Sequence, residues 1–253
     1  MIGIVGGVGP YSGIDLLKKV FDHTLANSDQ EHLDVVLLSM SSGIKDRTEY
    51  VLGEVKENPG TAIAKVLLKL QDSGATIAGI PCNTAHSYEI FNRINLELKK
   101  NTATITVLHM IDETLSYIAA NHPNITRVGV LSTTGTYKTG LYTNALQSKG
   151  FEAVTPSLAI QEELIHPAIY HPSYGIKSES NPIAPQAREN LMKGISFLKE
   201  RGAQAIILGC TEIPLAITEK KLDNILLIDP TTVLARALIR FSNPEKLKPI
   251  SPI

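Results

Sequence analysis

Residues 202–215, GAQAIILGCTEIPL, repeat the plan of residues 74–89, GATIAGIPCNTAHSYE. Each stretch begins with Gly-Ala, continues as a short apolar run and reaches a cysteine that small polar residues follow. Cys82 and Cys210 are the two cysteines of the chain, and each lies at the same offset from its Gly-Ala pair. This match predicts an internal duplication in which the cysteines occupy equivalent positions.

The plan extends through both halves of the chain, where strand-sized apolar runs alternate with helical patterns. The runs expected to form strands are residues 2–5, 34–40, 76–80, 104–108, 127–131, 205–208 and 225–228. Near-continuous apolar strands separated by helices are typical of parallel sheets that helices cover on both faces. The sequence therefore predicts an α/β fold of two pseudo-symmetric lobes, each a mainly parallel sheet flanked by helices, with the active site in the cleft between them.

Two further expectations concern the segments between these runs. Ile14, Leu17, Phe21 and Leu25 recur at three- and four-residue spacing, which predicts a helix from Pro10 to about residue 26. Irregular structure is expected at residues 41–53, at residues 161–185, which are rich in His, Pro, Ser and Tyr, and in a frayed tail at residues 244–253. Long irregular segments in compact domains commonly serve function, so we expect residues 161–185 to lie at the site.

Several of these segments directly follow expected strands. They are residues 6–10, 46–48, 82–84, 133–136 and 210–212. Ligands bind at the carboxyl ends of the strands in open α/β sheets. The sequence therefore predicts that these segments converge on one site.

The composition excludes several classes of partner. The 253 residues include 24 basic and 25 acidic side chains without a basic stripe, so neither nucleic acid nor a membrane surface is an expected partner. The apolar runs are too short to span a bilayer. The N-terminal MIGIVGG lacks the basic region of a signal peptide, so we expect a cytoplasmic protein with reduced thiols.

The residues favour neither a metal nor a nucleotide cofactor. Cys82 and His86 have a spacing that could present two metal ligands on one helical face. Cys210, however, is followed by Glu212 and no histidine, and no cysteine pair has zinc spacing. The glycines of residues 6–13 miss the dinucleotide-binding spacing by one position, which favours a tight turn and a helix start.

A buried cysteine taken alone is commonly a small hydrophobic residue. Here each cysteine follows an apolar run and precedes an expected helix start, where backbone N–H groups favour a thiolate. The duplication therefore favours a catalytic pair, Cys82 and Cys210. Arg47 is either a solvated charge or a forked partner for a carboxylate. Thr133 and Thr136 are compatible with turn formation and with anion binding alike.

Five motifs resemble the aspartate/glutamate racemase family, most closely its aspartate racemase branch. They are GGVGP (6–10), DRT (46–48), PCNTAH (81–86), AIYHPSYGIK (168–177) and GCTEIPL (209–215), within a resemblance that covers about residues 2–239. The resemblance implies that two bases interconvert amino-acid enantiomers without pyridoxal phosphate or another cofactor. It also implies a homodimer and two lobes that exchange their last helices, at residues 1–108 plus 229–253 and at residues 109–228.

The resemblance further implies roles for individual residues. Cys82 and Cys210 are the expected bases, on opposite faces of the substrate α-carbon. The expected substrate contacts are Asn83, Thr84 and Thr211 at the α-carboxylate and amino groups, Arg47 and Lys177 at the distal carboxylate, and Val8 where the family often has methionine. Thr133 and Thr136 join this set as anion-binding candidates because of their hydroxyls, not because of the resemblance. Glu212 is expected to orient the site near Cys210.

The predicted reaction is the interconversion of L- and D-aspartate, with glutamate as the next substrate. Removal of an α-proton leaves a carbanion that must spread into its own carboxylate, so fixed donors around that group are required. Maleate isomerisation, hydantoin racemisation and malonate-type decarboxylation stay open as chemistries of the wider superfamily, although decarboxylation needs a single cysteine. A non-catalytic carboxylate-binding protein is the alternative from another class.

Overall fold

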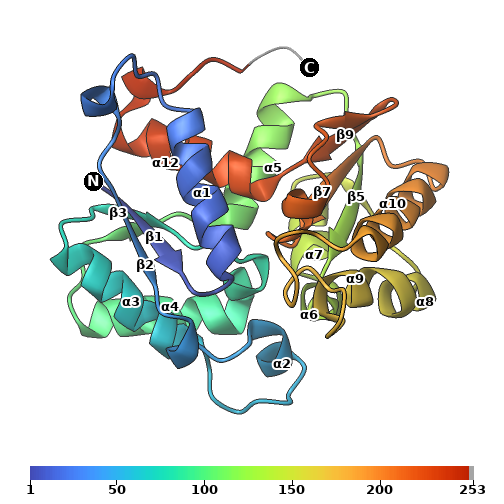
Figure 1. Cartoon of the computed structure of the whole chain (residues 1–253), viewed down its shortest axis with the longest axis horizontal. Helices are drawn as coiled ribbons and strands as arrows, with labels where there is room; N and C mark the ends of the chain where they lie inside the picture. The colour runs from blue at the N-terminus through green and yellow to red at the C-terminus, as the bar shows by residue number, and fades with distance from the viewer. Residues whose placement is uncertain (251–253) are drawn as a thin grey trace. The chain divides into compact units, whose positions relative to one another are not determined.

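The computed structural model describes residues 1–250, and it divides into two compact units (Figure 1). The first unit comprises Met1–Glu113 and the C-terminal segment that begins at Thr231, and the second comprises Thr114–Pro230. Residues 251–253 lie outside the described residues. They were expected to be the last residues of the first lobe and of the frayed tail. Each unit has its own sheet and apolar core, and the predicted α/β class with parallel sheets is confirmed.

Parallel strands form the sheet of the first unit in the order β2-β1-β3-β4. They are β1 (Ile2–Gly6), β2 (Val35–Ser39), β3 (Ile77–Gly79) and β4 (Thr106–Val107). The long helices of this unit are α1 (Pro10–Asp22), α3 (Gly60–Asp72), α4 (Tyr88–Lys100) and α12 (Pro230–Ser242). The predicted strands are therefore present, with shorter bounds at β2, β3 and β4.

Helices cover both faces of this sheet, as the side chains of β1 show. Successive side chains of a strand point to opposite faces. Val5 belongs to a core that includes Leu67 of α3, whereas Ile4 belongs to a core that includes Leu238 of α12. The apolar character of the whole strand follows from burial on both faces.

Helix α1 differs from the prediction in its end and in its buried face. It ends at Asp22 instead of residue 26, and Ile14 is 56% exposed. The buried side of the helix carries Gly13, Leu16 and Val20. A Cβ at position 13 would lie 3.2 Å from the Cα of Gly6, so this small-residue side lets the helix approach β1 closely. Close packing against the sheet therefore outweighs burial of the larger apolar stripe.

The expected frayed tail is wrong for residues 244–248. A 3₁₀ turn, Pro244–Lys246, is followed by backbone pairing with the chain that leaves α1. The Leu25 N–H donates to the Lys246 carbonyl at 2.7 Å, and the Lys248 N–H donates to the His23 carbonyl at 2.9 Å. These bonds tie the C-terminal segment to the first unit.

The second unit repeats this topology with one addition. Its strands are β5 (Arg127–Ser132), β6 (Glu152–Val154), β7 (Ala205–Gly209), β8 (Lys221–Leu222) and β9 (Ile225–Ile228). Their order is β6-β5-β7-β9-β8, and all pairs are parallel except β8 with β9. Strands β3 and β7, which lead to the two cysteines, therefore occupy equivalent places beside the first strand of their sheets.

The helices of the second unit vary widely in length. They are α5 (Met110–Asn121), which enters the unit at Thr114, α6 (Thr134–Lys138), α7 (Leu141–Ser148), α8 (Leu158–Ile160), the π-turn η4 (Gln161–Ile165), α9 (His166–Tyr170), α10 (Pro185–Glu200) and α11 (Ile213–Ala216). The expected loop at residues 161–185 is thus helical until Tyr170. Ile165, Ala168 and Ile169 are fully buried, because their helical spacing turns one apolar face to the core.

The expected loop at residues 41–53 is also partly helical. It contains a 3₁₀ turn, Ser41–Gly43, and the short helix α2 (Arg47–Val51). Asp46 caps α2 by accepting the Thr48 N–H at 2.7 Å and the Glu49 N–H at 3.1 Å. Across residues 1–250, no helix combines the length and the apolar character that a membrane span requires.

Candidate active site

The first cysteine site begins where β3 ends. Cys82 follows the strand by three residues and precedes a 3₁₀ turn, Asn83–His86. The Cys82 side chain is buried, as are Asn83 and Thr84. The Cys82 carbonyl accepts the Ala85 N–H at 3.2 Å and lies 2.9 Å from Nδ1 of His86. From the sequence, His86 was considered only as a possible metal ligand, and its contact with the Cys82 carbonyl was not predicted.

His86 lies in an aromatic environment. Its ring stacks on Phe91 with centroids 5.3 Å apart and meets the edge of His109 at 4.8 Å. Burial lowers the pKa of His86 to about 3, and the neighbouring His109 ring acts in the same direction. Imidazole 86 is therefore neutral at physiological pH and is no proton acceptor for a thiol there.

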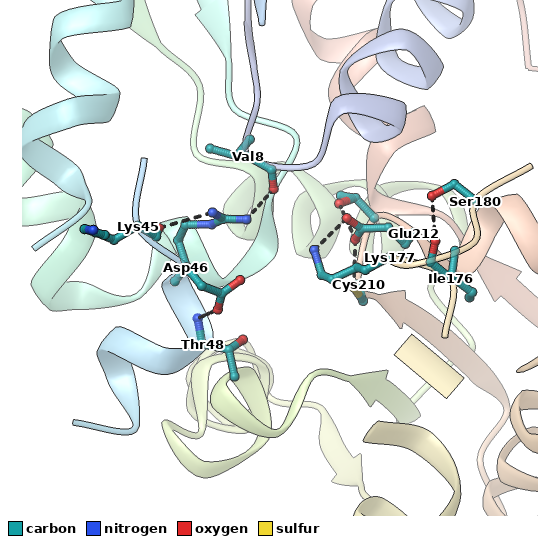
Figure 2. A network of polar contacts seen from close by, with 11 residues as sticks. Val8, Lys45, Asp46, Thr48, Ile176, Lys177, Ser180, Cys210 and Glu212 are labelled. Atoms are coloured by element: carbon teal, nitrogen blue, oxygen red, sulfur yellow. Dashed lines mark hydrogen bonds and ion pairs between the residues drawn. The ribbon is translucent and has the colours of Figure 1, made fainter. Parts of the chain in front are cut away.

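Arg47 is hydrogen-bonded to the backbone of Val8 in the first unit. The guanidinium of Arg47 donates to the Val8 carbonyl at 2.6 Å and to the Lys45 carbonyl at 3.2 Å. Figure 2 shows Val8, Lys45 and the hydrogen bond of the Asp46–Thr48 cap. Arg47 is only 7% exposed, so the alternative of a solvated charge is wrong.

The second cysteine site begins where β7 ends. Cys210, Thr211 and Glu212 are all buried and lead into α11. The Cys210 thiol donates to Oε2 of Glu212 at 3.0 Å, and the Thr211 hydroxyl donates to the same oxygen at 3.3 Å. The other oxygen, Oε1, accepts from the Lys177 ammonium at 2.7 Å (Figure 2).

This network sets the protonation of Cys210. Burial raises the pKa of the Cys210 thiol well above its usual value, and the Glu212 carboxylate raises it further. Lys177 acts in the opposite direction without cancelling these effects. Cys210 therefore rests as a thiol with a carboxylate in hydrogen-bond contact, an arrangement suited to proton transfer.

Thr133 and Thr136 lie together at the end of β5. The Thr133 hydroxyl oxygen accepts the Thr136 N–H at 3.3 Å and caps α6. The amide of Gln161, which is fully buried in the π-turn, donates to the Ser132 carbonyl at 3.0 Å and to the Thr134 hydroxyl at 3.4 Å. Turn formation is thus present at this loop, and the supporting contact from Gln161 has no signal in the sequence.

The structure thus gathers the candidate residues into separate groups within each unit. The first unit holds Cys82, Asn83 and Thr84 in one turn and the bonded pair Val8 and Arg47; the second holds Cys210, Thr211, Glu212 and Lys177 in one network and the pair Thr133 and Thr136. Over the described part of the chain, no three His, Cys, Asp or Glu side chains cluster as metal ligands would.

Comparison with known proteins places the chain among amino-acid racemases. The sequence profile of the family described as Asp/Glu/Hydantoin racemase matches residues 5–238. The broad specificity amino-acid racemase RacX of Bacillus subtilis is 27% identical over 94% of this chain and 96% of its own length.

Two solved structures resemble the chain over nearly its whole length. The Picrophilus torridus aspartate racemase has a TM-score of 0.77 and 30% identity, over 95% of this chain and 93% of its own. An aspartate racemase homologue from Pyrococcus horikoshii OT3 has a TM-score of 0.69 and 22% identity, over 95% and 98% of the two chains. The chain therefore belongs to the Asp/Glu/Hydantoin racemase family and is an isomerase of the racemase class.

Proposed function

We propose that this racemase interconverts L- and D-aspartate, with glutamate as a second substrate, through two thiols and without a cofactor. Cys82 and Cys210 are the two bases, acting on one α-carbon from opposite faces. The observation that carries the proposal is the Cys210–Glu212–Lys177 network, because it equips one of two equivalent cysteines to hold and exchange a proton.

Racemisation by this route needs one thiolate and one thiol at the start of each turnover. When Cys210 acts as the acid, its thiol proton passes to the α-carbon and leaves a thiolate. When Cys210 acts as the base, it begins as that thiolate and takes the α-proton, while Cys82 donates its thiol proton to the opposite face of the carbanion. Glu212 stays a carboxylate in both directions and accepts the hydrogen bond of the Cys210 thiol. Positioned acid–base groups contribute roughly 10²–10⁴-fold, so donors around the substrate carboxylate must supply the remainder.

The substrate carboxylates are assigned to the polar residues beside the thiols. Asn83, Thr84 and Thr211 hold the α-carboxylate and the amino group, while Thr133 and Thr136 provide further hydroxyl and backbone contacts. Arg47 and Lys177 receive the distal carboxylate, and Val8 lines the pocket. The proposed lobes comprise residues 1–108 plus 229–253 and residues 109–228, and each contributes one cysteine.

The test is proton exchange in heavy water. Wild-type enzyme is incubated with L-aspartate in D₂O, and loss of the α-proton signal and appearance of the D-enantiomer are followed by NMR and chiral chromatography. Cys82→Ser and Cys210→Ser should each abolish racemisation. Absence of exchange with any acidic amino acid, or full activity in either variant, would contradict the proposal.

A second candidate is a racemase for neutral amino acids, and one observation favours it. Both cations proposed for the distal carboxylate already have protein partners, Arg47 at the Val8 carbonyl and Lys177 at Glu212. A substrate without a second carboxylate would leave both contacts intact. The same D₂O assay decides between the candidates when L-alanine, L-asparagine and L-glutamine are compared with L-aspartate and L-glutamate.

The proposed enzyme acts in the cytoplasm as a homodimer. Light scattering coupled to gel filtration measures the mass in solution against the 27.4 kDa of one chain. A single peak at the mass of one chain would contradict the dimer.

A further inference from the structure

His86 is the polar residue of the PCNTAH motif to which the proposed reaction gives no role. The residue is 2% exposed, and Nδ1 lies 2.9 Å from the Cys82 carbonyl oxygen. A carbonyl oxygen only accepts hydrogen bonds, so Nδ1 of the neutral ring carries the hydrogen. His86 is therefore a donor to the backbone of the residue that carries the first thiol.

This bond fixes more than the Cys82 carbonyl. The Ala85 N–H donates to the same oxygen at 3.2 Å, so two donors occupy its two lone pairs. The Cys82–Asn83 peptide is trans, and a trans peptide is planar with its C=O and N–H pointing in opposite directions. Holding the Cys82 carbonyl therefore also sets the direction of the Asn83 N–H, on the side away from the imidazole.

The imidazole is itself held in place. Phe91 stacks against one side of the ring and His109 meets it edge-on, with centroids 5.3 and 4.8 Å away. Because the buried ring stays neutral, it adds no charge beside Cys82 and leaves the proton inventory of the thiols unchanged. The ring thus acts as a rigid, uncharged donor.

The second copy of the motif lacks this device. Pro214 stands at the position equivalent to His86, and the Cys210 carbonyl accepts the Ile213 N–H at 2.9 Å. The turn after β7 closes without an imidazole, so the equivalent turn after β3 does not require one for its formation. The bond from His86 therefore has another reason to exist.

We propose that His86 is a positioning residue of the racemase reaction, which aims the Asn83 N–H at the substrate α-carboxylate by holding the Cys82 carbonyl. This inference rests on the proposed function, since it concerns the carboxylate contact assigned to Asn83. Charge moves into the carboxylate when the α-proton leaves, and a fixed donor gains strength at that moment. Loss of the positioning bond should therefore lower kcat more than it raises KM.

The test compares three replacements at position 86. Asparagine places its side-chain N–H near the position of Nδ1, whereas glutamine reaches toward Nε2 and leucine has no donor. We expect His86→Asn to keep kcat for aspartate within roughly tenfold of wild type, while His86→Gln and His86→Leu lose roughly 10²–10³-fold, as removal of an oxyanion donor does. KM should change by less than kcat in all three.

Packing alone predicts the opposite order. Glutamine and leucine are closer to histidine in volume than asparagine is, so they should be the better replacements if the ring only fills space. Activity of the glutamine or leucine variant equal to or above that of the asparagine variant would overturn the positioning role. A loss carried mainly by KM would overturn it as well. Urea unfolding of each variant checks that it is folded.

A measurement on the unmutated enzyme keeps the inference testable if a variant fails to fold. Long-range ¹H–¹⁵N NMR reports the tautomer of each histidine, and we expect the Nδ1–H form for His86. The Nε2–H form would remove the bond to Cys82 and overturn the inference, whatever the enzyme catalyses. Absence of α-proton exchange by wild type, in contrast, would overturn the proposed function while the tautomer result still stands.

Discussion

Cys82 and Cys210 occupy equivalent positions of a duplicated sequence, yet their neighbours differ. Cys210 donates its thiol hydrogen to a carboxylate that Lys177 holds, whereas the contact from His86 is to the backbone of Cys82. In a two-base racemisation the two thiols are in opposite protonation states at the start of each turnover. The duplicated sequence alone does not distinguish the two thiols. Their different neighbours do, because the surroundings of Cys210 favour its protonated form.

The residue-scale prediction concerns the pH at which Cys210 becomes a thiolate. Glu212 raises the pKa of Cys210 and Lys177 lowers it, so their removal should act in opposite directions. We expect Glu212→Gln to move the pH midpoint of Cys210 alkylation by iodoacetamide down, and Lys177→Met to move it up by less, because Glu212 is the stronger of the two charge effects on the pKa of Cys210. Peptide mass spectrometry follows Cys210, with Cys82 as an internal reference.

A matched control comes from a surface ion pair. Lys193→Met removes an ammonium that pairs with Glu189 on the exposed side of α10, so it should leave the midpoint of Cys210 unchanged. Shifts of the same sign for the two site variants would contradict electrostatic control by the Glu212–Lys177 pair. Unchanged midpoints in both would assign the raised pKa to burial alone.

The sequence predicted the residue types of the site better than their contacts. Motifs identify Cys82, Cys210 and Glu212 because these residues lie within a few positions of a strand end. The bond from Lys177 to Glu212 joins residues 35 positions apart, and its formation depends on a helix that the sequence did not predict at residues 161–170. Side-chain direction after such a segment is a property of the folded unit, so spacing along the chain carries no signal for it.

At the scale of elements, prediction was correct where burial is two-sided and wrong where two apolar faces compete. Strands such as β1 and β7 are buried throughout, and their sequences are nearly continuous apolar runs. Helix α1 carries two candidate faces, and the smaller one, with Gly13, packs on the sheet. Hydrophobic periodicity counts side-chain size and polarity, but it has no measure of how closely a helix must approach a strand.

Close approach also explains why α3 begins with glycine, and it gives the element-scale prediction. A Cβ at Gly60 would lie 2.6 Å from the Ile90 carbonyl oxygen of α4. Asn58 fixes the same junction, since its side chain accepts the Gly60 N–H at 2.8 Å and donates to the Glu89 carbonyl at 3.2 Å. Alanine normally favours a helix over glycine by roughly 1 kcal/mol, but here it must push two helices apart.

We therefore expect Gly60→Ala to lower the free energy of unfolding by about 1–3 kcal/mol, as overpacked sites do. Urea denaturation followed by circular dichroism measures the change. Gly43→Ala is the control, because a Cβ at position 43 has no neighbour within 4 Å among the described residues and should alter stability by less than about 0.5 kcal/mol. Stabilisation by Gly60→Ala would show that the α3–α4 contact yields to the added methyl group.

At the scale of the whole molecule, the described residues form three apolar cores that share no residue, two in the first unit and one in the second. Leu238 of α12 belongs to a core of the first unit, and Leu198 of α10 belongs to the core of the second. The second unit is one continuous segment, whereas the first needs both ends of the chain, including the strand-like pairing at residues 244–248. The racemase fold thus places its last helix far in sequence from the sheet that it covers.

The last prediction concerns two leucines, each of which packs against a glycine in the sheet of its own unit. A Cβ at Gly79 of β3 would lie 2.9 Å from Leu238, and one at Gly129 of β5 would lie 3.2 Å from Leu198. Both leucines are fully buried, so Leu238→Ala and Leu198→Ala should each cost about 2–5 kcal/mol. Native-state hydrogen exchange with mass spectrometry should locate the loss, with faster exchange in β1 and β3 for the first variant and in β5 and β7 for the second. Faster exchange to the same extent in both sheets for either variant would mean that the two units open as one cooperative body, and the matched pair of leucines would then report only global stability.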